Sequence, residues 1–373
     1  MKCRLLVPAI AALALVSPVL GAPPQVTGRA WLVENGSTGQ VLLAHNANRP
    51  VPIASLTKLM TVLLTLEHTH LDDVVTVSRE AAATRDSTVT FRAGERLTVR
   101  ELLEAALIAS ANDAADALAS YVGDGSEASF VAMMNARAKQ LGLRETHFVR
   151  PDGLDAPGHL SSAHDVTFLA RLLMHHPIVR QIVRMRVATI SDGHILHTWN
   201  DLLYNYPGIF GVKTGHTSGA GWNETAAAHR RGVSIYATLL GSPDRSTRNA
   251  DLVKLLDWGF SRYVAVRPVV RGQAYATALL GYGHGPLALV AAATPRLVVP
   301  VGRPLVRRVV FPDVVSLPVA EGQSLGQVRV YQGGRLLAVV PLVASRSSSR
   351  PGVAGRVGWY ATRTLHDMLG WFS

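Results

Sequence analysis

The residue pattern changes near Val266, and this change constrains the fold more than any other feature of the chain. Before it, Ala- and Leu-rich stretches with helical spacing accompany a hairpin and a strand. After it, Gly and Pro cut the chain into short Val- and Leu-rich segments typical of strands. The 373 residues, 48% of them hydrophobic, are enough for two cores. We therefore predict an α/β (α+β) unit over residues 22–265 and a small all-β domain over residues 266–345.

The first unit is predicted to contain a hairpin, several helices and a late strand. Residues 28–46 alternate around a turn at Asn35-Gly36, as a hairpin does. The helical stretches run from Ser55 toward Glu67 and over residues 98–121, 128–141, 164–174 and 249–260, and the strand covers residues 232–240.

The second unit is predicted to be a β-sandwich or barrel without chemistry of its own. Its strands are expected at residues 297–299, 306–311, 314–317, 327–331 and 336–340. Gln332-Gly333-Gly334 marks one hairpin turn. The Ser- and Arg-rich residues 346–355 are predicted to be a linker.

The N-terminus resembles an export signal. Lys2 and Arg4 precede an apolar run from Leu5 to Val16, and small residues up to Gly21 offer a cleavage site. An uncleaved anchor is the alternative, but the apolar run is short and contains Pro8. We predict a signal peptide over residues 1–21. The only cysteine, Cys3, would leave with it, so neither a disulfide nor thiol catalysis is expected.

The C-terminal segment, residues 356–373, has the pattern of an amphipathic helix. Its apolar side chains, including Leu365, Leu369 and Phe372, fall on one face, whereas Trp359 falls on the other. Such a helix packs on its own domain or lies in a membrane interface. The preceding linker, the terminal aromatics and the positive charge favour the membrane surface.

The charge of the chain directs it toward anionic partners. The sequence has 37 Lys and Arg against 26 Asp and Glu, a formal charge of +11, which becomes +9 without Lys2 and Arg4. Acidic lipid and anionic wall polymer are candidates. We predict no nucleic-acid partner, because no recognised motif is present and aromatics make up only 6%. The sequence gives no oligomeric state.

Three short motifs carry the chemistry. Ser55-Leu56-Thr57-Lys58 is S-x-x-K, Ser110-Ala111-Asn112 is S-x-N, and Lys213-Thr214-Gly215 is K-T-G. Each alone has a plain structural explanation, since Ser often caps a helix and polar triplets form turns. Together and in this order they match the set of penicillin-interacting serine enzymes.

These residue types fit acyl transfer. Ser55 needs a base to become a nucleophile, and Lys58 lies on the same helix face at i+3. Lys58 can serve as base only if burial or a neighbouring cation such as Lys213 lowers its pKa. Ser110 would relay a proton to the leaving amine, and Asn112 would hydrogen-bond Lys58 and the substrate amide.

Substrate binding is assigned to the third motif. Lys213 and Thr214 would hold a terminal carboxylate, and Gly215 would let the substrate lie close to the strand. The backbone N–H of His216, with the helix start at Ser55, would form an oxyanion hole. No metal or cofactor is predicted, because His68-Thr69-His70 is not an H-E-x-x-H motif.

With their surroundings, the motifs resemble the low-molecular-mass penicillin-binding D-alanyl-D-alanine carboxypeptidases. The similar stretches are Pro52–Thr61, Ala109–Ala115, Gly211–Thr217, Phe148–Leu154, Gly158–Ala163 and Leu255–Phe260. The similarity covers about residues 28–262, and the β-rich region with its tail resembles the membrane-anchored subgroup.

The resemblance implies a β-lactamase/transpeptidase-like fold and removal of the terminal D-Ala from peptidoglycan stem pentapeptides. It also implies acylation by β-lactams, anchoring at the outer face of the cytoplasmic membrane in the periplasm, and Arg248 as a helper for the substrate carboxylate. The chain departs from the family at Trp222–Thr225, at Asp152 and at Phe210-Gly211.

Other functions remain as alternatives. A D-Ala endopeptidase that cuts cross-links would share the site, although such enzymes generally lack the β-rich domain. A β-lactamase would need a deacylating Glu, and Glu127 and Glu145 are not in such a setting. A Ser-His-Asp hydrolase lacks a G-x-S-x-G elbow despite 14 His, and an inactive wall-binding scaffold would not require all six polar motif residues.

Overall fold

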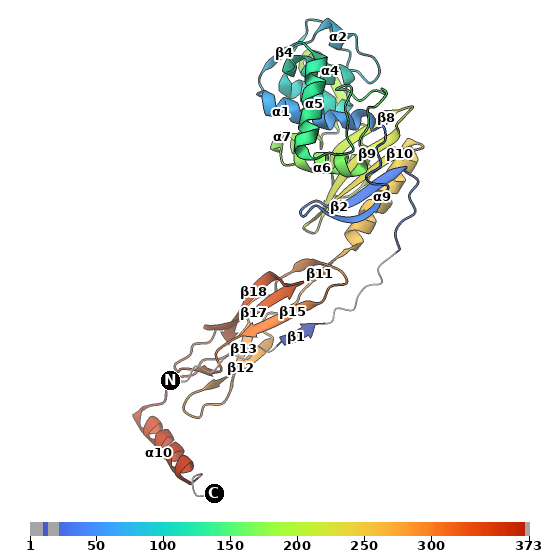
Figure 1. Cartoon of the computed structure of the whole chain (residues 1–373). Helices are drawn as coiled ribbons and strands as arrows, with labels where there is room; N and C mark the ends of the chain where they lie inside the picture. The colour runs from blue at the N-terminus through green and yellow to red at the C-terminus, as the bar shows by residue number, and fades with distance from the viewer. Residues whose placement is uncertain (1–9, 14–21, 370–373) are drawn as a thin grey trace. The chain divides into compact units, whose positions relative to one another are not determined.

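The protein is described by a computed structural model that covers residues 10–13 and 22–369. Its described part divides into two compact units (Figure 1), and the chain passes from one to the other at Arg262–Tyr263. We call residues 22–262 the N-terminal unit, and residues 263–369 with residues 10–13 the β unit. No helix within the described ranges is long and apolar enough to cross a membrane.

The N-terminal unit is built on a five-stranded antiparallel sheet in the order β3-β2-β10-β9-β8. The strands are β2 (Ala30–Asn35), β3 (Gln40–His45), β8 (Ile209–Thr217), β9 (Gly221–Arg230) and β10 (Val233–Ser242). The predicted hairpin is β2–β3, and the predicted late strand is β10. Because residues 30–35 are buried throughout, β2 is an interior strand of the sheet.

Helices cover both faces of this sheet. Side chains alternate along a strand, so Ile235 and Thr238 of β10 point to opposite faces. Thr238 is hydrogen-bonded to Thr167 of α6 (Ala163–Leu173), with 2.7 Å between their oxygens. Ile235 lies against Gly259 of α9 (Arg245–Ser261), where a larger residue would collide with it. This layered arrangement is the α/β architecture expected of the first unit.

The remaining helices form a lobe that includes α1 (Lys58–His68), whose residues from Lys58 to Thr65 are all buried. The lobe contains α2 (Arg79–Ala82), α3 (Val99–Glu104), α4 (Asn112–Val122), α5 (Glu127–Leu141), α7 (Pro177–Ile182) and α8 (Leu202–Asn205). Two small hairpins complete it, β4 (Val74–Thr76) with β5 (Arg96–Thr98) and β6 (Val187–Thr189) with β7 (Ile195–His197), together with a 3-10 turn at Ser191–Gly193.

The helix predicted over residues 98–121 is interrupted at Ser110. α3 runs into a π-helical turn, Ala105–Ala109, and Ser110 then adopts a left-handed conformation with φ 60° and ψ 29°. The chain restarts as α4 at Asn112. Ser110 therefore lies in the bend between two helical segments and not within a helix.

The β unit contains a seven-stranded sheet and a separate two-stranded one. The order of the large sheet is β1-β15-β17-β18-β13-β12-β16, and β11 pairs with β14. The strands are β1 (Ile10–Leu13), β11 (Tyr263–Val266), β12 (Ala274–Leu280), β13 (Leu287–Ala291), β14 (Leu297–Pro300), β15 (Leu305–Val310), β16 (Val314–Val315), β17 (Ser324–Gln332) and β18 (Arg335–Ala344). Val and Leu side chains fill its core.

Sequence patterns located most, but not all, of these strands. The predicted turn at Gln332-Gly333-Gly334 joins β17 to β18. The predictions omitted β11, β12 and β13. Of the predicted signal peptide, only residues 10–13 are described, as β1 beside β15; residues 1–9 and 14–21 lie outside the described residues.

The segment between the β unit's last strand and the tail is more ordered than a linker. Ser348 forms a β-bridge with Val319, and Arg350 Nε donates to the carbonyl of Leu317 at 2.9 Å. The tail helix, α10 (Val353–Leu369), begins three residues earlier than predicted, and residues 370–373 lie outside the described part.

Trp359 has a contact that explains its position off the apolar stripe. Its ring lies edge-on to Tyr282, with 5.4 Å between the centroids. The same helix face that carries Trp359 therefore packs on the β unit.

Candidate active site

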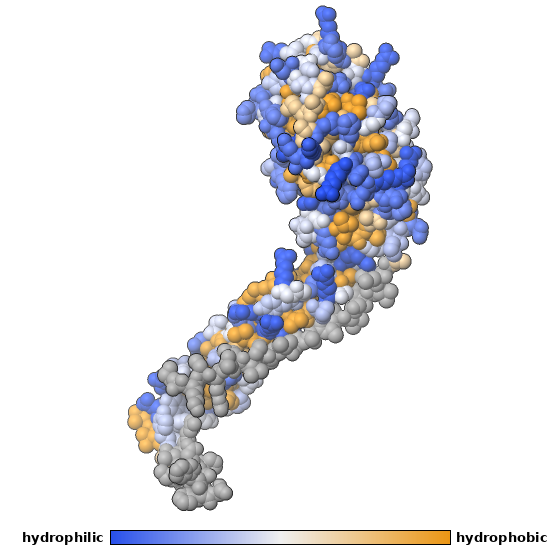
Figure 2. Space-filling view, in the orientation of Figure 1, coloured by the Kyte–Doolittle hydropathy of each residue, from blue (hydrophilic) through white to orange (hydrophobic). Residues whose placement is uncertain are grey.

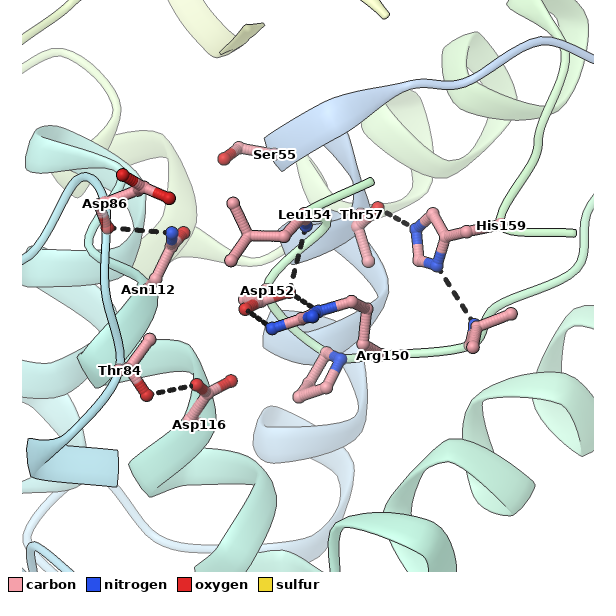
Figure 3. Close-up of polar contacts among 12 residues, drawn as sticks. Ser55, Thr57, Thr84, Asp86, Asn112, Asp116, Arg150, Asp152, Leu154 and His159 are labelled. Atoms are coloured by element: carbon pink, nitrogen blue, oxygen red, sulfur yellow. Dashed lines mark hydrogen bonds and ion pairs between the residues drawn. The ribbon is translucent and has the colours of Figure 1, made fainter. Parts of the chain in front are cut away.

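The first motif brings the side chains of Ser55 and Lys58 into contact. Residues Ala54–Thr57 form a 3-10 turn that leads into α1, so Ser55 precedes the helix and Lys58 begins it. The spacing of three brings Lys58 Nζ within 2.9 Å of Ser55 Oγ. Figure 3 shows Ser55 at the end of this turn, with its hydroxyl pointing away from the helix.

Lys58 is fully buried and has an acceptor for each of its three protons. Besides Ser55 Oγ, its ammonium donates to Asn112 Oδ1 at 2.6 Å and to the carbonyl of Asp152 at 2.7 Å. Burial lowers the Lys58 pKa to about 8, although the nearby carboxylates of Asp152 and Asp116 oppose this shift. A pKa this near neutrality makes Lys58 usable as a base.

The second and third motifs meet across the cleft. Lys213 of β8 is buried, and its Nζ donates to Ser110 Oγ at 2.7 Å and to the Thr214 carbonyl at 2.8 Å. Burial lowers the Lys213 pKa well below its usual value, and the positive charge of Lys58 adds to the effect. Two lysines therefore each hold one serine hydroxyl, Lys58 that of Ser55 and Lys213 that of Ser110.

A cleft of about 690 Å³ opens over these groups. Among the residues predicted for the site, those that line it are Ser55, Ser110, Asn112, Thr214, Gly215, His216 and Arg248. The structure thus brings all nine predicted residues together, with Lys58 and Lys213 reaching the cleft through the two serines.

Gly215 is required by the close approach of β8 to the nucleophile turn. A Cβ at this position would lie 2.9 Å from the backbone nitrogen of Ser55 and 3.0 Å from the Ile53 carbonyl. Only glycine leaves room for β8 beside Ser55, so that backbone N–H groups from both segments are close together.

Arg248 is held in the cleft wall by groups that the motifs do not include. Only 1% of Arg248 is exposed, and its Nε lies 3.1 Å from Oε2 of Glu224 on β9. Asn249 Oδ1 accepts from Arg248 Nη2 at 2.7 Å, and the Trp222 ring lies 5.7 Å from the guanidinium carbon. His216 in turn stacks on Trp222 at 4.1 Å.

Glu224 is the residue that sequence reasoning noticed without giving it a role. It lies within one of the departures from the family pattern, Trp222–Thr225, and that departure was the available signal. Its carboxylate is fully buried, and neither oxygen accepts a well-aligned hydrogen bond from a described residue. Burial raises the Glu224 pKa to about 7 against the opposing attraction of Arg248.

The floor of the site is fixed by a second set of buried polar groups, which Figure 3 shows below and beside Ser55. Asp152, another departure, pairs with Arg150 at 2.6 Å while its carbonyl accepts from Lys58. His159 contacts Thr57 Oγ1 at 2.7 Å, and Thr57 donates to the Ala54 carbonyl. These contacts hold the backbone on both sides of Ser55.

The buried lysines of the cleft lie beside the hydroxyls of two serines, Lys58 at Ser55 and Lys213 at Ser110. Within the described ranges, no group of three or more His, Cys, Asp and Glu side chains is arranged to hold an ion. A serine beside a buried lysine of lowered pKa, next to backbone N–H groups, is arranged for acyl transfer. The fold and site together define a serine hydrolase of the penicillin-interacting type.

Comparison with known proteins agrees with this class. The family model described as D-alanyl-D-alanine carboxypeptidase matches residues 18–244. The D-alanyl-D-alanine carboxypeptidase DacF of Bacillus subtilis is 33% identical, over 87% of this chain and 86% of its own length. DacD of Salmonella typhimurium, of the same description, is 32% identical over 96% of this chain and 98% of its own.

A solved structure is similar over both units. Penicillin binding protein 5 from Haemophilus influenzae superimposes with a TM-score of 0.64 at 27% identity, covering 88% of this chain and all of that one. The chain belongs to the D-alanyl-D-alanine carboxypeptidase family and is a serine-type carboxypeptidase, a hydrolase. The predicted fold class, with its β-rich domain and C-terminal helix, is confirmed.

Proposed function

We propose that this enzyme removes the terminal D-Ala from peptidoglycan stem pentapeptides through an acyl-enzyme on Ser55. The observation that carries the assignment is the buried Lys58 Nζ, 2.9 Å from Ser55 Oγ, with a pKa lowered to about 8. The names of the relatives, all D-alanyl-D-alanine carboxypeptidases, support the substrate class.

The first half of the reaction forms an ester. With Lys58 neutral, its lone pair takes the Ser55 proton while its two remaining N–H groups donate to Asn112 and to the Asp152 carbonyl. Ser55 Oγ attacks the carbonyl carbon of the penultimate D-Ala, and the backbone N–H groups of Ser55 and His216 stabilise the oxyanion. The peptide bond then breaks as Ser110 gives its hydroxyl proton to the leaving amine of the terminal D-Ala. The proton that Lys58 took from Ser55 passes to Ser110 Oγ, so that Lys58 is neutral again before deacylation.

The second half consumes one water. Lys58 takes a proton from water, the resulting hydroxide attacks the ester carbonyl, and the proton returns to Ser55 Oγ as the shortened peptide leaves. Lys213, Thr214 and Arg248 bind the terminal carboxylate of the substrate during acylation. The positive charge and the fork of Arg248, together with the Thr214 hydroxyl, suit a carboxylate. A β-lactam, which also carries a carboxylate beside a reactive amide, acylates the same Ser55.

Product analysis with a stem pentapeptide tests this function. Purified enzyme is expected to release one D-Ala per peptide, and Ser55→Ala to release none and to lose labelling by a fluorescent penicillin. The same assay with a cross-linked muropeptide dimer separates the endopeptidase alternative. Cleavage of the dimer without release of D-Ala from the pentapeptide would refute the proposal.

The location of the enzyme is proposed from the N-terminal residues 1–21 and from the C-terminal helix α10. We infer that residues 1–21 direct export and are removed, and that α10 then holds the protein at the outer surface of the cytoplasmic membrane. The amphipathic pattern of the tail and exposed apolar side chains such as Val353 and Val357 support this placement. Deleting residues 351–373 should release the protein from membranes while kcat for the pentapeptide stays unchanged.

A further inference from the structure

The formal charge of the chain lies almost entirely in the β unit. Residues 22–262 contain 23 Lys and Arg against 23 Asp and Glu. Residues 263–373 contain twelve Arg and no Lys against three acidic residues, a net charge of +9. Every ion pair between described residues joins two residues of the N-terminal unit. The arginines of the β unit are thus not neutralised by ion pairing within the described structure.

Two of these arginines face each other across the large sheet. β15 and β17 are antiparallel, and their register sets Arg308 directly opposite Arg329. Their neighbours Val309, Val328 and Val330 point into the core. Because side chains alternate along a strand, the side chains of Arg308 and Arg329 both project from the outward face of the sheet.

The neighbours of this pair orient it without neutralising it. The Arg308 guanidinium lies 5.2 Å from the Tyr331 ring centroid. With its amide turned so that the oxygen faces Arg329, Gln327 accepts from Nη2 at 2.6 Å and from Nε at 3.0 Å. Both partners are uncharged. Like charges directly opposite each other on a sheet are destabilising, so folding alone does not favour this arrangement.

Protection of a sheet edge does not account for the pair. Charged residues on edge strands prevent edge-to-edge association, and this could explain Arg308 if β1 leaves with the signal peptide. It does not explain Arg329, because β17 is paired on both sides, with β15 and with β18. The charge of Arg329 lies in the middle of the outward face.

The rest of the face is partly apolar. Val339 and Leu336 of β18 are 48% and 47% exposed. Figure 2 shows strongly hydrophilic patches among hydrophobic surface over the strands that Figure 1 labels β15 and β17. Arginine forks with a tyrosine ring and aliphatic side chains combine recognition of an anion with contact to the apolar face of a sugar ring.

We propose that the outward face of β15, β17 and β18 is a docking surface for an anionic glycan, a polysaccharide that carries carboxylate or phosphate groups. The positive charge of the face is complementary to that of an anionic polymer. α10 supplies the contact proposed for lipid, so the two attachments use different elements. The docking surface retains the enzyme on the polymer without taking part in the acyl transfer.

The test measures binding of the full-length enzyme to fluorescent polygalacturonate, a carboxylated polysaccharide, with neutral dextran of the same length as reference. Wild type is expected to bind polygalacturonate and not dextran, and more weakly as salt rises. Arg308→Gln/Arg329→Gln should lose about tenfold in affinity. The matched control Arg271→Gln/Arg296→Gln removes two exposed arginines elsewhere in the same unit and should lose less than about threefold.

Two further measurements keep the result decisive. Arg308→Lys/Arg329→Lys keeps the net charge but removes the forks, and should still lose several-fold in affinity. Amide hydrogen exchange of β15, β17 and β18 reports whether the β unit of each variant stays folded. Equal losses in the face and control variants, or no loss in the face variants, would overturn the proposal. The proposal would also be overturned if a variant at Arg308 and Arg329 kept polygalacturonate binding and lost binding to phosphatidylglycerol vesicles. That outcome assigns the outward face to lipid.

Discussion

The two units of this chain handle charge in opposite ways. The N-terminal unit is neutral overall but buries charged side chains, namely Glu34, Lys58, Asp113, Asp152, Asp165, Lys213, Glu224, Arg248 and Asp251. The β unit carries a charge of +9, yet its buried polar side chains in the described part are Gln332 and Ser348. Net charge and buried charge are therefore independent properties, and here they separate by unit.

The difference shows that charged side chains serve different purposes in the two units. A buried ion must be stabilised by partners of fixed geometry, and its pKa responds strongly to them. This is how Lys58 becomes a base near neutral pH. An exposed arginine costs little and retains its charge, so it suits recognition of a charged partner and not proton transfer.

The largest effect is expected from removing the buried base. Lys58→Met should lower kcat/KM for D-Ala release by about 10³-fold or more, because Ser55 then lacks a proton acceptor. The rate of penicillin acylation should fall in parallel. Arg308→Gln, which removes one exposed cation from the β unit, should leave both rates within about twofold. Comparable losses in the two variants would contradict the division between the units.

Glu224→Gln tests the cost of a buried carboxyl. Because the folded pKa is raised from 4.5 to about 7, the folded state binds the proton more tightly than the unfolded state. Wild type should therefore lose stability as pH rises from about 4.5 to 7, on the order of 3 kcal/mol. The Glu224→Gln variant should lack this pH-dependent loss of stability.

Urea midpoints at pH 5 and pH 8, read by loss of fluorescent-penicillin binding, measure the Glu224 effect. Between pH 5 and pH 8, the urea midpoint of wild type should fall by more than that of Glu224→Gln. Parallel changes in the two proteins would show that Glu224 does not titrate in this range.

His159 should act in the opposite direction. Burial lowers its pKa from 6.5 to about 4, so the folded state binds the proton less tightly than the unfolded state. The stability it contributes is present above pH 6.5 and is lost as pH falls toward 4. His159→Gln can keep a donor to Thr57 and should weaken this acid sensitivity by roughly 2 kcal/mol. Urea midpoints of wild type and His159→Gln at pH 4.5 and pH 7 test this prediction. If the midpoint changes with pH by the same amount in both proteins, His159 is ruled out as the cause.

The smallest effect is expected on the β unit. Arg329→Gln removes a like charge opposite Arg308 and should stabilise the β15–β17 pair by about 0.2–1 kcal/mol at low salt, with little gain at high salt. Amide hydrogen exchange of these strands measures it. Slower exchange in wild type than in the variant would mean that Arg329 stabilises the sheet.

Local patterns were sufficient for much of the fold. Alternation around a turn located β2–β3, and helical spacing located α5, α6 and α9, because each of these helices buries one face along its own length. The patterns did not reveal the break at Ser110, since the stretch from α3 to α4 is rich in helix-forming Ala and Leu. They also missed β12 and β13, which pair with each other, while β13 pairs in addition with β18, distant in sequence.

The site divides in the same way. Residue spacing is enough to identify the reacting groups: Ser55 with Lys58 follows from a spacing of three on one helix face, and the order of the three motifs identifies the family. How those groups behave depends on the folded structure. Glu224, Asp152 and His159 act through burial and through contacts with Arg248, Arg150 and Thr57, and burial is a property of the folded chain. Likewise, composition gives the charge of +9, but strand register alone sets Arg308 opposite Arg329.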